Sequence, residues 1–525
     1  MKIIILAAGR GSRMHTGQIH KGLLPFRGKA VISHTIDQFP DHEFVIAVHH
    51  LKDQVVDYIR LAHPNTKVTY VDVGSIDTAS AGPGFSLMCA LDVAREESLV
   101  VTCDTYFKLP PATPFYCDWI GVADIVPAEA VSYCNVRIDS GAVTELYDKV
   151  INPRATHMWT GLMYIFHWKS ALANLRARLP FETEMQCSDS WLGMQLCPVG
   201  HEWIDLGTKS RYIAALEADG YDYSKPTECT YVLRDRVIKF FADPLRKKIR
   251  SIRQVSELAH VTPTEIQDAS QHFVAYEKAP GKTFYEAGTP ELFNSFLKWM
   301  RQNVWVPSDY SQIKEDALKF YGHKTSERVR KYLETEPHKD FDSVNGVKIV
   351  KTWEQILASV NWGEFVKDTK CVAFHGDLNF DNIIVNEGAF TLIDWRDSFG
   401  NCYEGGDIYY EYAKLLSGIT FDFDLVKKGD FRVIDSHGNA VITFARRTVN
   451  DQYEDILMRD AVEHGLDWDK IDFLRWMILA GMSGLHKAPY STALFYYSLG
   501  QANLSLFMNY AFLIQDSSKC HLRVQ

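Results

Sequence analysis

The sequence predicts an α/β protein of two domains, the first with a mainly parallel sheet and helices on both faces. Over about the first 215 residues, short β-rich runs alternate with helical patterns. This βαβ rhythm is typical of a parallel sheet that is covered on both sides. Turn-forming residues gather at 220–228, which indicates a domain boundary. Beyond them come short strands and then mostly helical patterns, which predict an α+β domain with a small lobe and a larger helical lobe.

The expected elements follow one another in regular order. In the first domain we expect strands at 2–7, 44–48, 68–71 and 99–102, and helices at 30–39, 53–61 and 85–94. The second domain is expected to begin with strands at 231–233, 237–241 and 273–276. These patterns place the domains at 1–222 and 228–525, with a small lobe over about 228–280 and a large lobe over about 281–525. Parallel sheets of this kind bind ligands at the carboxyl ends of their strands.

Composition restricts the class of protein. The chain has 525 residues, of which 46% are hydrophobic and 23% charged, and this is typical of a soluble globular protein with several cores. Its formal net charge is −10, whereas nucleic acids and anionic membranes attract proteins with a basic face. We therefore expect small-molecule substrates, no nucleic-acid partner and no membrane insertion. A homo-oligomer is compatible with this composition.

Cysteine usage and the apolar segments favour the cytoplasm. The ten cysteines include no C-x-x-C pair, which argues against zinc clusters and thioredoxin-type redox sites. The apolar amino-terminal run ends at Gly9, Arg10 and Arg13, too early for a signal peptide. No uninterrupted apolar segment of about 18 residues occurs, so no transmembrane helix is expected.

A glycine-rich turn follows the first expected strand. The turn reads Ala-Gly-Arg-Gly-Ser-Arg at 8–13, and the block Lys-Gly-Leu-Leu-Pro follows at 21–25. Glycines at the end of a strand let backbone N–H groups approach a triphosphate closely, and Arg13 and Lys21 carry the charge to neutralise it. Many strand–helix turns contain glycine, so the evidence lies in the combination of strand, turn and lysine block.

This combination resembles the signature of the sugar-phosphate nucleotidyltransferases and their phosphocholine cytidylyltransferase relatives, L-A-A-G-x-G-[ST]-R-[ML] followed by K-x-L-[LMV]-P. The resemblance covers roughly residues 1–215 and implies a Rossmann-like nucleotidyltransferase domain with Arg13 and Lys21 as catalytic residues. Gly82 lies where the family recognises the base of the NTP, and the NTP is expected to be CTP or GTP. The nucleotide-binding residues that the resemblance implies are Leu6, Ala7, Ala8, Gly9, Gly11, Ser12, Arg13, Lys21 and Gly82.

A pair of acids extends the resemblance. Asp104 follows the strand expected at 99–102, and Asp205 begins an Asp-Leu-Gly-Thr segment that resembles the family's D-x-G-T. By resemblance, the two carboxylates hold a Mg²⁺ that bridges the nucleotide and the acceptor phosphate. The chemistry agrees, because a reaction that joins two anions needs a hard cation with oxygen ligands. Either aspartate alone is better explained as the cap of a turn, whereas the pair favours the metal.

Two positions are expected to bind the acceptor. Lys149 resembles the family's lysine that contacts the acceptor phosphate, and Gly161 resembles a glycine that lets the acceptor approach. A solvated surface lysine is the alternative for Lys149. Trp159 and Thr160 replace the asparagine that the family has before this glycine, which leaves the identity of the acceptor open.

A second motif lies far downstream. His375, Asp377 and Asn382 follow the spacing H-x-D-x-x-x-x-N, and Asp394 comes about twelve residues later. Protein kinases place a catalytic Asp, a metal-binding Asn and a second metal-binding Asp in the same relation. Trp395 follows the last of these acids instead of Phe-Gly, and no activation-loop pattern follows. The motif therefore favours a small-molecule kinase over a protein kinase.

The motif resembles the aminoglycoside phosphotransferase and choline kinase superfamily, which phosphorylates hydroxyls of small molecules. The resemblance is sharp over about 370–415 and extends roughly over 228–525, which implies a bilobal kinase-like domain. It implies Asp377 as the catalytic residue that orients the attacking hydroxyl or accepts its proton. It implies Asn382 and Asp394 as ligands of Mg²⁺ on the ATP phosphates.

Three further residues complete the expected kinase site. Lys239, in an expected strand of the small lobe, would steady the ATP phosphates as a nucleotide-binding residue. A surface lysine is the alternative, because no clear glycine-rich loop precedes it. His375 is expected to buttress the catalytic loop, and Asp407 resembles the structural aspartate that fixes this loop.

Two nucleotide-handling sites on one chain suggest consecutive reactions. The leading hypothesis is a bifunctional enzyme that phosphorylates a small hydroxyl compound with ATP and then transfers a nucleotidyl group from a second NTP to that phosphate, with release of pyrophosphate. The hydroxyl compound is expected to be a sugar, Mg²⁺ to serve both domains, and the product to be an NDP-activated precursor for surface glycan. One alternative is a choline or amino-alcohol kinase joined to a CTP:phosphocholine-type cytidylyltransferase. Another is a nucleotidyltransferase whose kinase-like domain is a non-catalytic sensor.

Overall fold

The structure, a computed structural model, describes residues 1–14, 18–74, 82–179, 184–219, 227–247, 261–262, 270–334, 340–403, 405–485 and 490–511. The chain divides into two compact units. The first consists of Met1–Lys247 and Gln267–Lys278, and the second of Lys248–Ile266 and Ala279–Gln525. Each unit has hydrophobic cores of its own.

A mixed sheet of nine strands forms the centre of the first unit. β1 (Lys2–Ala7) lies between β4 (Glu43–Val48) and β6 (Ser98–Thr102) and is parallel to both, and β5 (Val68–Asp72) extends the parallel part beyond β4. On the other side, β11 (His157–Ile165) pairs antiparallel with β6. The remaining strands are β8 (Trp119–Asp124), β9 (Cys134–Asp139), β10 (Ala142–Asp148) and β12 (Cys197–Gly200). The four strands expected in this part are confirmed to within one residue at each end.

Helices cover both faces of this sheet, as expected. Successive side chains of a strand point to opposite faces. The odd-numbered residues of β1 share a hydrophobic core with α1 (Val31–Gln38) and α2 (Lys52–Ala62), and the even-numbered ones share another with α3 (Pro83–Ala94) and α4 (Trp168–Ala177). After β5 the chain crosses to the opposite side of β1 to form β6. Such a reversal of strand order is where α/β sheets bind ligands, beyond the carboxyl ends of the strands.

Smaller elements bring distant segments to these strand ends. β7 (Thr105–Lys108) pairs antiparallel with β13 (Glu202–Asp205), which α5 (Lys209–Asp219) follows. The ribbon therefore carries residues from beyond position 200 to the turn after β6. The other short elements are β2 (Pro25–Phe26), β3 (Lys29–Ala30) and the 3₁₀ helices η1 (Ser12–Met14), η2 (Lys21–Leu23), η3 (Pro127–Ser132) and η4 (Cys187–Trp191).

A three-stranded antiparallel sheet also belongs to the first unit. It consists of β14 (Glu228–Val232), β15 (Arg236–Phe241) and β16 (Phe273–Glu277), close to the strands expected for the small lobe. Its inner residues join the core beneath α2, where the ring of Tyr231 lies 4.8 Å from that of Tyr58. The contacts thus group this sheet with the amino-terminal domain, whereas the domain limits at 222 and 228 stay a prediction.

The second unit is mostly helical with small sheets, a mixture of α and β elements. Its sheet strands are β17 (Lys282–Thr283), β21 (Ile383–Asn386) and β22 (Ala389–Leu392); β18 (Ser343–Val344), β19 (Val347–Lys348), β24 (Phe431–Ser436) and β25 (Asn439–Phe444); and β20 (Cys371–Val372) with β23 (Gly406–Asp407). Its short helices are α7 (Phe284–Ala287), α9 (Ile313–Leu318), η6 (Lys319–Lys324), α10 (Thr325–Leu333), α11 (Trp353–Ala358), α12 (Trp362–Phe365), η7 (Phe380–Asn382) and α14 (Phe423–Lys427). Its long helices are α8 (Pro290–Asn303), α13 (Ile408–Phe421), α15 (Asn450–Glu463), α16 (Trp468–Met482) and α17 (Tyr490–Ala511). The bilobal kinase-like arrangement stays a prediction.

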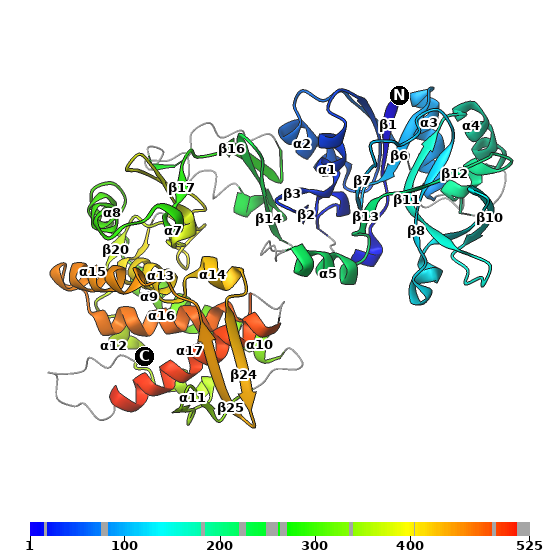
Figure 1. Cartoon of the computed structure of the whole chain (residues 1–525). Helices are drawn as coiled ribbons and strands as arrows, with labels where there is room; N and C mark the ends of the chain where they lie inside the picture. Colours follow the sequence, from blue (N-terminus) through cyan, green and yellow to red (C-terminus); the bar gives the residue numbers. More distant parts are fainter. Residues whose placement is uncertain are drawn as a thin grey trace. The chain divides into compact units, whose positions relative to one another are not determined.

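Helix α13 is the centre of the second unit. All of its residues are buried, and it packs against α15 and α16 (Figure 1). A helix with such a largely apolar sequence is typical of a buried position. The loop that precedes β21 lies against this helix, so α13 supports the segment with the second motif.

None of the helices in the described ranges is long and apolar enough to cross a membrane. The cysteines that the structure describes are free.

Candidate active sites

Lys21 and Asp104 form a buried ion pair beyond the parallel strands. Lys21 begins η2, and Asp104 lies two residues beyond the end of β6. Lys21 Nζ lies 2.8 Å from Asp104 Oδ2, and the two side chains are 16% and 10% exposed. Burial by itself lowers the pKa of a lysine and raises that of an aspartate. Here the mutual attraction outweighs burial, so the pKa of Lys21 is raised and that of Asp104 is lowered. Both groups are charged at neutral pH.

Asp205 lies beside Asp104 because β13 pairs with β7. The register places Asp205 opposite Thr105, the residue that follows Asp104. A Cβ atom on Gly207 would lie 2.8 Å from Asp104 Oδ2 and 3.0 Å from Asp205 Oδ1, so these two oxygens are within about 6 Å of each other. The fold therefore brings together the two acids that the sequence predicts to share a metal.

Two residues that the sequence analysis missed, Tyr133 and Arg211, hold Asp205. Tyr133 OH donates to Asp205 Oδ2 at 2.5 Å, and Arg211 Nη1 donates to the same oxygen. The Arg211 guanidinium lies 4.7 Å from the centroid of the Tyr133 ring, a cation–π distance. An arginine in the first turn of a helix and a tyrosine before a strand are ordinary in sequence. Only the fold reveals that both meet one carboxylate.

The glycine-rich turn passes over Lys21. Gly11 has a φ of +63°, which favours glycine, and a Cβ there would lie 3.5 Å from the Lys21 side chain. Gly9, Ser12 and Arg13 are exposed. The positive charge of Arg13 acts against protonation of Lys21, so the two cations lie close to each other. The turn thus offers exposed backbone and a cation beside the buried ion pair.

The residues before the turn connect it to the sheet. Leu6 O accepts a hydrogen bond from Cys103 N at 3.2 Å, and Ala8 O accepts one of 3.4 Å from a backbone N–H in the loop after β4. Ala7 O lies 2.9 Å from the ring nitrogen Nε2 of His20. These three residues therefore position the turn through their carbonyl groups.

His20 is a buried imidazole that connects β1 to Lys21. It is 1% exposed. Its Nδ1 accepts from Gly22 N at 3.1 Å, so Nε2 carries the proton and donates to Ala7 O. Burial lowers the pKa of His20 from 6.5 to about 4, so the ring is neutral at pH 7. The imidazole therefore fixes the start of the turn and the backbone beside Lys21 at the same time.

Acid is expected to destabilise this part of the first unit. The pKa of His20 is about 4 in the folded chain, whereas an unperturbed histidine has a pKa of 6.5. Between these two pH values the unfolded chain therefore binds one more proton than the folded chain. The contribution of His20 to the free energy of unfolding is therefore fully present above pH 6.5. The free energy of unfolding decreases by about 3 kcal/mol as the pH falls to 4. Hydrogen exchange of peptides that cover β1, corrected for the intrinsic effect of pH, measures this change. His20→Gln is expected to flatten the pH dependence; identical curves for variant and wild type contradict the prediction.

Gly161, a predicted acceptor residue, lies beside Thr102 and Thr105, which flank Asp104 in the chain, and the backbone of Lys149, the other one, contacts Tyr133. Gly161 sits at a register shift in β11 with a φ of +84°, and a Cβ there would lie 2.8 Å from Thr102 Oγ1. This close approach to the end of β6 requires glycine. Lys149 follows β10 with an exposed side chain, and its backbone N donates to Tyr133 O at 2.9 Å. It is thus adjacent to the tyrosine that holds Asp205.

Gly82 caps the amino end of α3. A Cβ on Gly82 would lie 2.4 Å from Met185 O, so a larger residue does not fit there. The contact is with the backbone before η4, and the part of Gly82 in reading a base stays a prediction.

In the second unit, one loop and one hairpin bring Asp377, Asn382 and Asp394 together. Asn382 Nδ2 donates to Asp377 O at 2.8 Å. Ile393 N, next to Asp394, donates to Asn382 O at 3.0 Å. Asp394 has a φ of +63°, a conformation that aspartate adopts more readily than most residues and that often marks a functional position.

His375, which the sequence predicts to buttress this loop, and Glu411, a third residue that the sequence analysis missed, hold the loop. The carboxylate of Glu411, on the buried helix α13, accepts from His375 N at 3.0 Å and from Gly376 N at 2.7 Å. The His375 ring lies 2.7 Å through Nε2 from Ile393 O and accepts from Asp377 N at 3.2 Å through Nδ1. The ring therefore joins the loop to the hairpin, which agrees with its expected buttressing role.

Asp407 supports the loop from a distance. Its carboxylate accepts from Tyr321 OH at 2.7 Å and from the backbone N–H groups of Lys370 and Tyr409 at 3.3 Å. It thus caps α13 and holds the residue before β20, the strand that leads to the loop. The direct contacts to the loop come from Glu411 instead.

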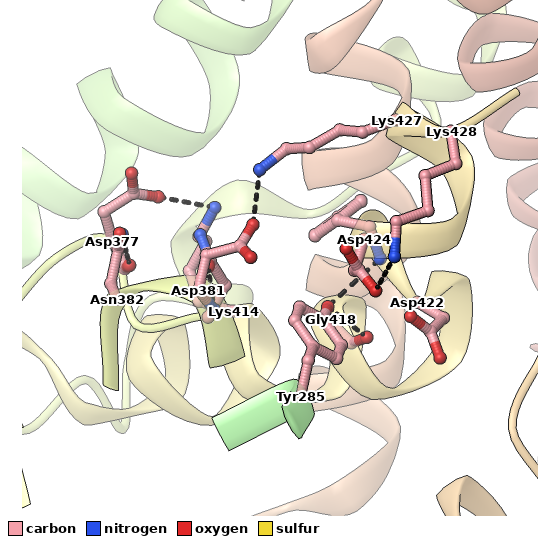
Figure 2. A network of polar contacts seen from close by, with 12 residues as sticks. Tyr285, Asp377, Asp381, Asn382, Lys414, Gly418, Asp422, Asp424, Lys427 and Lys428 are labelled. Atoms are coloured by element: carbon pink, nitrogen blue, oxygen red, sulfur yellow. Dashed lines mark hydrogen bonds and ion pairs between the residues drawn. The ribbon is translucent and has the colours of Figure 1, made fainter. Parts of the chain in front are cut away.

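A lysine on α13 pairs with Asp377 (Figure 2). Lys414 Nζ lies 2.7 Å from Asp377 Oδ1, and the lysine and aspartate side chains are 9% and 38% exposed. Burial raises the pKa of Asp377, but the positive charges of Lys414 and Arg396 outweigh it and hold the pKa well below its usual range. The sequence analysis missed Lys414, although a lysine inside the apolar run 408–421 is itself an indication of a buried charge.

Lys239 lies in β15 of the first unit, opposite Thr230 and Val274. It is buried, which contradicts the alternative of a surface lysine. Its role at the ATP phosphates stays a prediction.

Mg²⁺ fits the oxygen donors at both predicted metal sites. Proteins bind it through one or two carboxylates together with substrate phosphates and water, and Asp104 and Asp205 supply two carboxylates. At the second site, Asn382 uses its amide nitrogen for Asp377 O, so its amide oxygen and the Asp394 carboxylate would be the donors if a metal binds there, which stays a prediction. In the described ranges, no cluster of three or more His, Cys, Asp or Glu side chains is arranged to hold a metal ion by itself.

Comparisons with known proteins concern the amino-terminal part. Residues 3–114 match the family model of the MobA-like NTP transferase domain. No curated protein matches the chain. Similar solved structures include a UDP-glucose pyrophosphorylase complexed with UDP-glucose, with 17% identity and a TM-score of 0.36 over 42% of this chain and 97% of that one.

Two more solved structures are similar to the same extent. The inositol-1-phosphate CTP transferase from T. maritima has 16% identity and a TM-score of 0.33 over 40% of this chain and 90% of that one. A UTP-bound UGPase from Acinetobacter baumannii has 15% identity and a TM-score of 0.34 over 42% and 93%. These values are too low to support any statement about this chain. The amino-terminal part thus contains a segment similar to the MobA-like NTP transferase domain, and this segment carries the glycine-rich turn, Lys21 and Asp104.

Proposed function

We propose that the amino-terminal domain is a nucleotidyltransferase, which transfers a nucleotidyl group from an NTP to the phosphate of a small molecule. One observation carries the proposal: the buried pair of Lys21 and Asp104 lies beside Asp205 and beneath a glycine-rich turn, beyond the ends of parallel strands. The similarity of residues 3–114 to an NTP transferase domain supports the same activity.

The proposed reaction joins two anions. An oxygen of the acceptor phosphate bonds to the α-phosphorus of the NTP, and the bond from this phosphorus to the bridging oxygen breaks. The electron pair leaves with pyrophosphate. Lys21 and the exposed Arg13 lower the repulsion between the reactants, and the turn offers backbone N–H groups to the phosphates. Mg²⁺ held by Asp104 and Asp205 would supply further positive charge between the two phosphates.

The acceptor is proposed to be a sugar 1-phosphate. The Asp-Leu-Gly-Thr segment at 205–208 favours this choice, and Lys149 and Gly161 are the proposed contacts to the acceptor. CTP or GTP is the proposed nucleotide, and phosphocholine is the alternative acceptor.

A panel of NTPs and phosphorylated acceptors, with pyrophosphate release as the readout, tests this proposal. The expected result is release with one NTP and one class of acceptor, and loss of release in the Asp104→Ala variant. If no pair releases pyrophosphate from the wild type, the assignment is wrong.

Arg211→Gln is expected to lower nucleotidyl transfer about 10²-fold. Arg211 and Tyr133 fix the Asp205 side chain, and a displacement of a reacting group by about 1 Å costs a factor of this order. Arg137→Gln is the matched control, since Arg137 Nε lies 2.6 Å from Asp139 Oδ2 in the same unit but away from the acid pair. A rate for Arg211→Gln equal to that of the control contradicts the prediction.

We further propose that the carboxy-terminal domain is a small-molecule kinase. The observation that favours it is the contact of Asp377 with Asn382 and, through the hairpin, the closeness of Asp394. In the proposed step, an acceptor hydroxyl oxygen bonds to the γ-phosphorus of ATP, the bond to the β–γ bridging oxygen breaks, and ADP leaves. The hydroxyl proton passes to the Asp377 carboxylate. In phosphoryl transfer such an acid mainly orients the hydroxyl.

The two activities together would make an NDP-activated precursor for surface glycan from a sugar, ATP and a second NTP. A choline or amino-alcohol kinase joined to a cytidylyltransferase is the alternative with the same two steps. A non-catalytic sensor in place of the kinase is the alternative of another class. ADP formation from ATP with a panel of sugars, choline and ethanolamine separates these three, because a sensor forms no ADP with any of them.

A further inference from the structure

We propose that Lys414 is a positioning residue of the kinase centre, which fixes the Asp377 side chain so that one carboxylate oxygen faces the acceptor hydroxyl. The inference rests on the proposed kinase activity. Lys414 comes from α13, far from the motif in sequence, and its ammonium group reaches Asp377 Oδ1 at 2.7 Å (Figure 2).

The burial of Lys414 calls for an explanation. Every residue of α13 is buried, and a charge in such a place is costly unless it is paired. An apolar residue of similar volume in place of a buried ion pair is often neutral or stabilising. Packing by itself therefore gives no reason for a lysine at position 414. The unequal exposure of the two side chains gives a reason for the lysine, because Lys414 is covered whereas the Asp377 side chain is 38% exposed. The lysine thus lies behind the carboxylate, and the carboxylate faces solvent.

A structural role in holding the loop is the alternative, and the backbone contacts argue against it. Glu411 binds the N–H groups of His375 and Gly376, and Asn382 binds the carbonyl of Asp377. The loop backbone is therefore held without Lys414. Lys414 binds the Asp377 carboxylate itself and not the backbone of the loop.

Binding of one oxygen determines what the other can do. With Oδ1 on Lys414, the side-chain torsions of Asp377 are restricted and Oδ2 is presented for the hydroxyl. A reaction is faster when the reacting group is already held in the reactive geometry before the chemical step. The hydroxyl then attacks the γ-phosphorus as described above, its proton passes to Oδ2, and ADP leaves with the electron pair of the broken bond.

The test compares Lys414→Met with the same substitution at a lysine that pairs with a different aspartate of the second unit. Lys428 Nζ lies 2.9 Å from Asp424 Oδ2, an exposed pair apart from Asp377 (Figure 2). ADP formation is measured with ATP and a panel of glucose, galactose, glycerol, choline, ethanolamine and water alone. Lys414→Met is expected to lower kcat about 10²-fold and leave the KM for ATP within about twofold. Lys428→Met is expected to leave both unchanged.

A double-mutant cycle decides whether Lys414 acts through Asp377. In the Asp377→Asn background, Lys414→Met is expected to cost nothing further, because there is no carboxylate left to position. An equal loss in both backgrounds overturns the inference, as does an unchanged kcat in the single variant. If Lys414→Met fails to fold, Lys414→Arg takes its place, and this variant is expected to keep part of the wild-type kcat. A kcat as low as that of Asp377→Asn overturns the role of Lys414. If the wild type forms no more ADP than Asp377→Asn, the kinase proposal itself fails, and the role of Lys414 fails with it.

Discussion

Asp104→Asn is expected to lower nucleotidyl transfer about 10³-fold, the order of loss when one preorganised electrostatic group is removed from an active site. The change removes the negative charge that holds Lys21 in place and a proposed donor for Mg²⁺. Pyrophosphate release at saturating substrates measures the effect.

The same change is expected to destabilise the first unit. Removal of one partner of a buried ion pair leaves the other charge uncompensated and costs about 3–5 kcal/mol. The control is Asp37→Asn, since Asp37 pairs with Lys29 on the surface at 2.5 Å and an exposed pair contributes about 0–1 kcal/mol. Urea unfolding of both variants separates the loss of activity from the loss of fold. If Asp104→Asn keeps the wild-type rate while folded, Asp104 has no part in the reaction.

Asp377→Asn is expected to lower ADP formation about 10³-fold, within the range of 10²–10⁴ that a positioned acid or base contributes. Asparagine keeps the shape of the side chain but does not accept the proton and forms no ion pair with Lys414. The KM for ATP is expected to stay near the wild-type value, because the proposed metal donors Asn382 and Asp394 are retained.

Asp381→Asn is the matched control for this variant. Asp381 lies in the same loop and pairs with another lysine, Lys427, on the exposed side (Figure 2). Its replacement is expected to leave ADP formation near the wild-type rate. Equal losses in the two variants would show that the charge of the loop matters and not the position of Asp377.

The local features of both candidate sites could be read from the sequence. The strand at 2–7, the glycine-rich turn after it and the spacing from His375 to Asp394 are set by residues close together in the chain. The predicted strands before position 103 are confirmed because their apolar runs are buried on both faces of one sheet. Lys21 and Asp104, which the sequence predicts as separate site residues, meet as an ion pair, since each follows an element that ends at the same edge of that sheet.

The partners from other elements could not be predicted. Tyr133 and Arg211 meet Asp205 because β13 and η3 end near each other, and no periodicity or motif encodes that meeting. The grouping of β14–β16 with the first unit is likewise a matter of shared core residues, of which Tyr231 is one. A strand pattern is the same whichever core it packs on.

The sequence by itself determined the α/β class, the order of the early strands and the residues of the two motifs, because periodicity, turn chemistry and motif spacing act over short stretches of chain. Only the tertiary structure decided which charges meet. Lys414 and Glu411 reach the loop of Asp377 from a buried helix, and Arg211 reaches Asp205 from the helix after β13. Side chains far apart in the chain are brought within hydrogen-bond distance by the packing of whole elements, and that packing depends on cores that no single segment specifies.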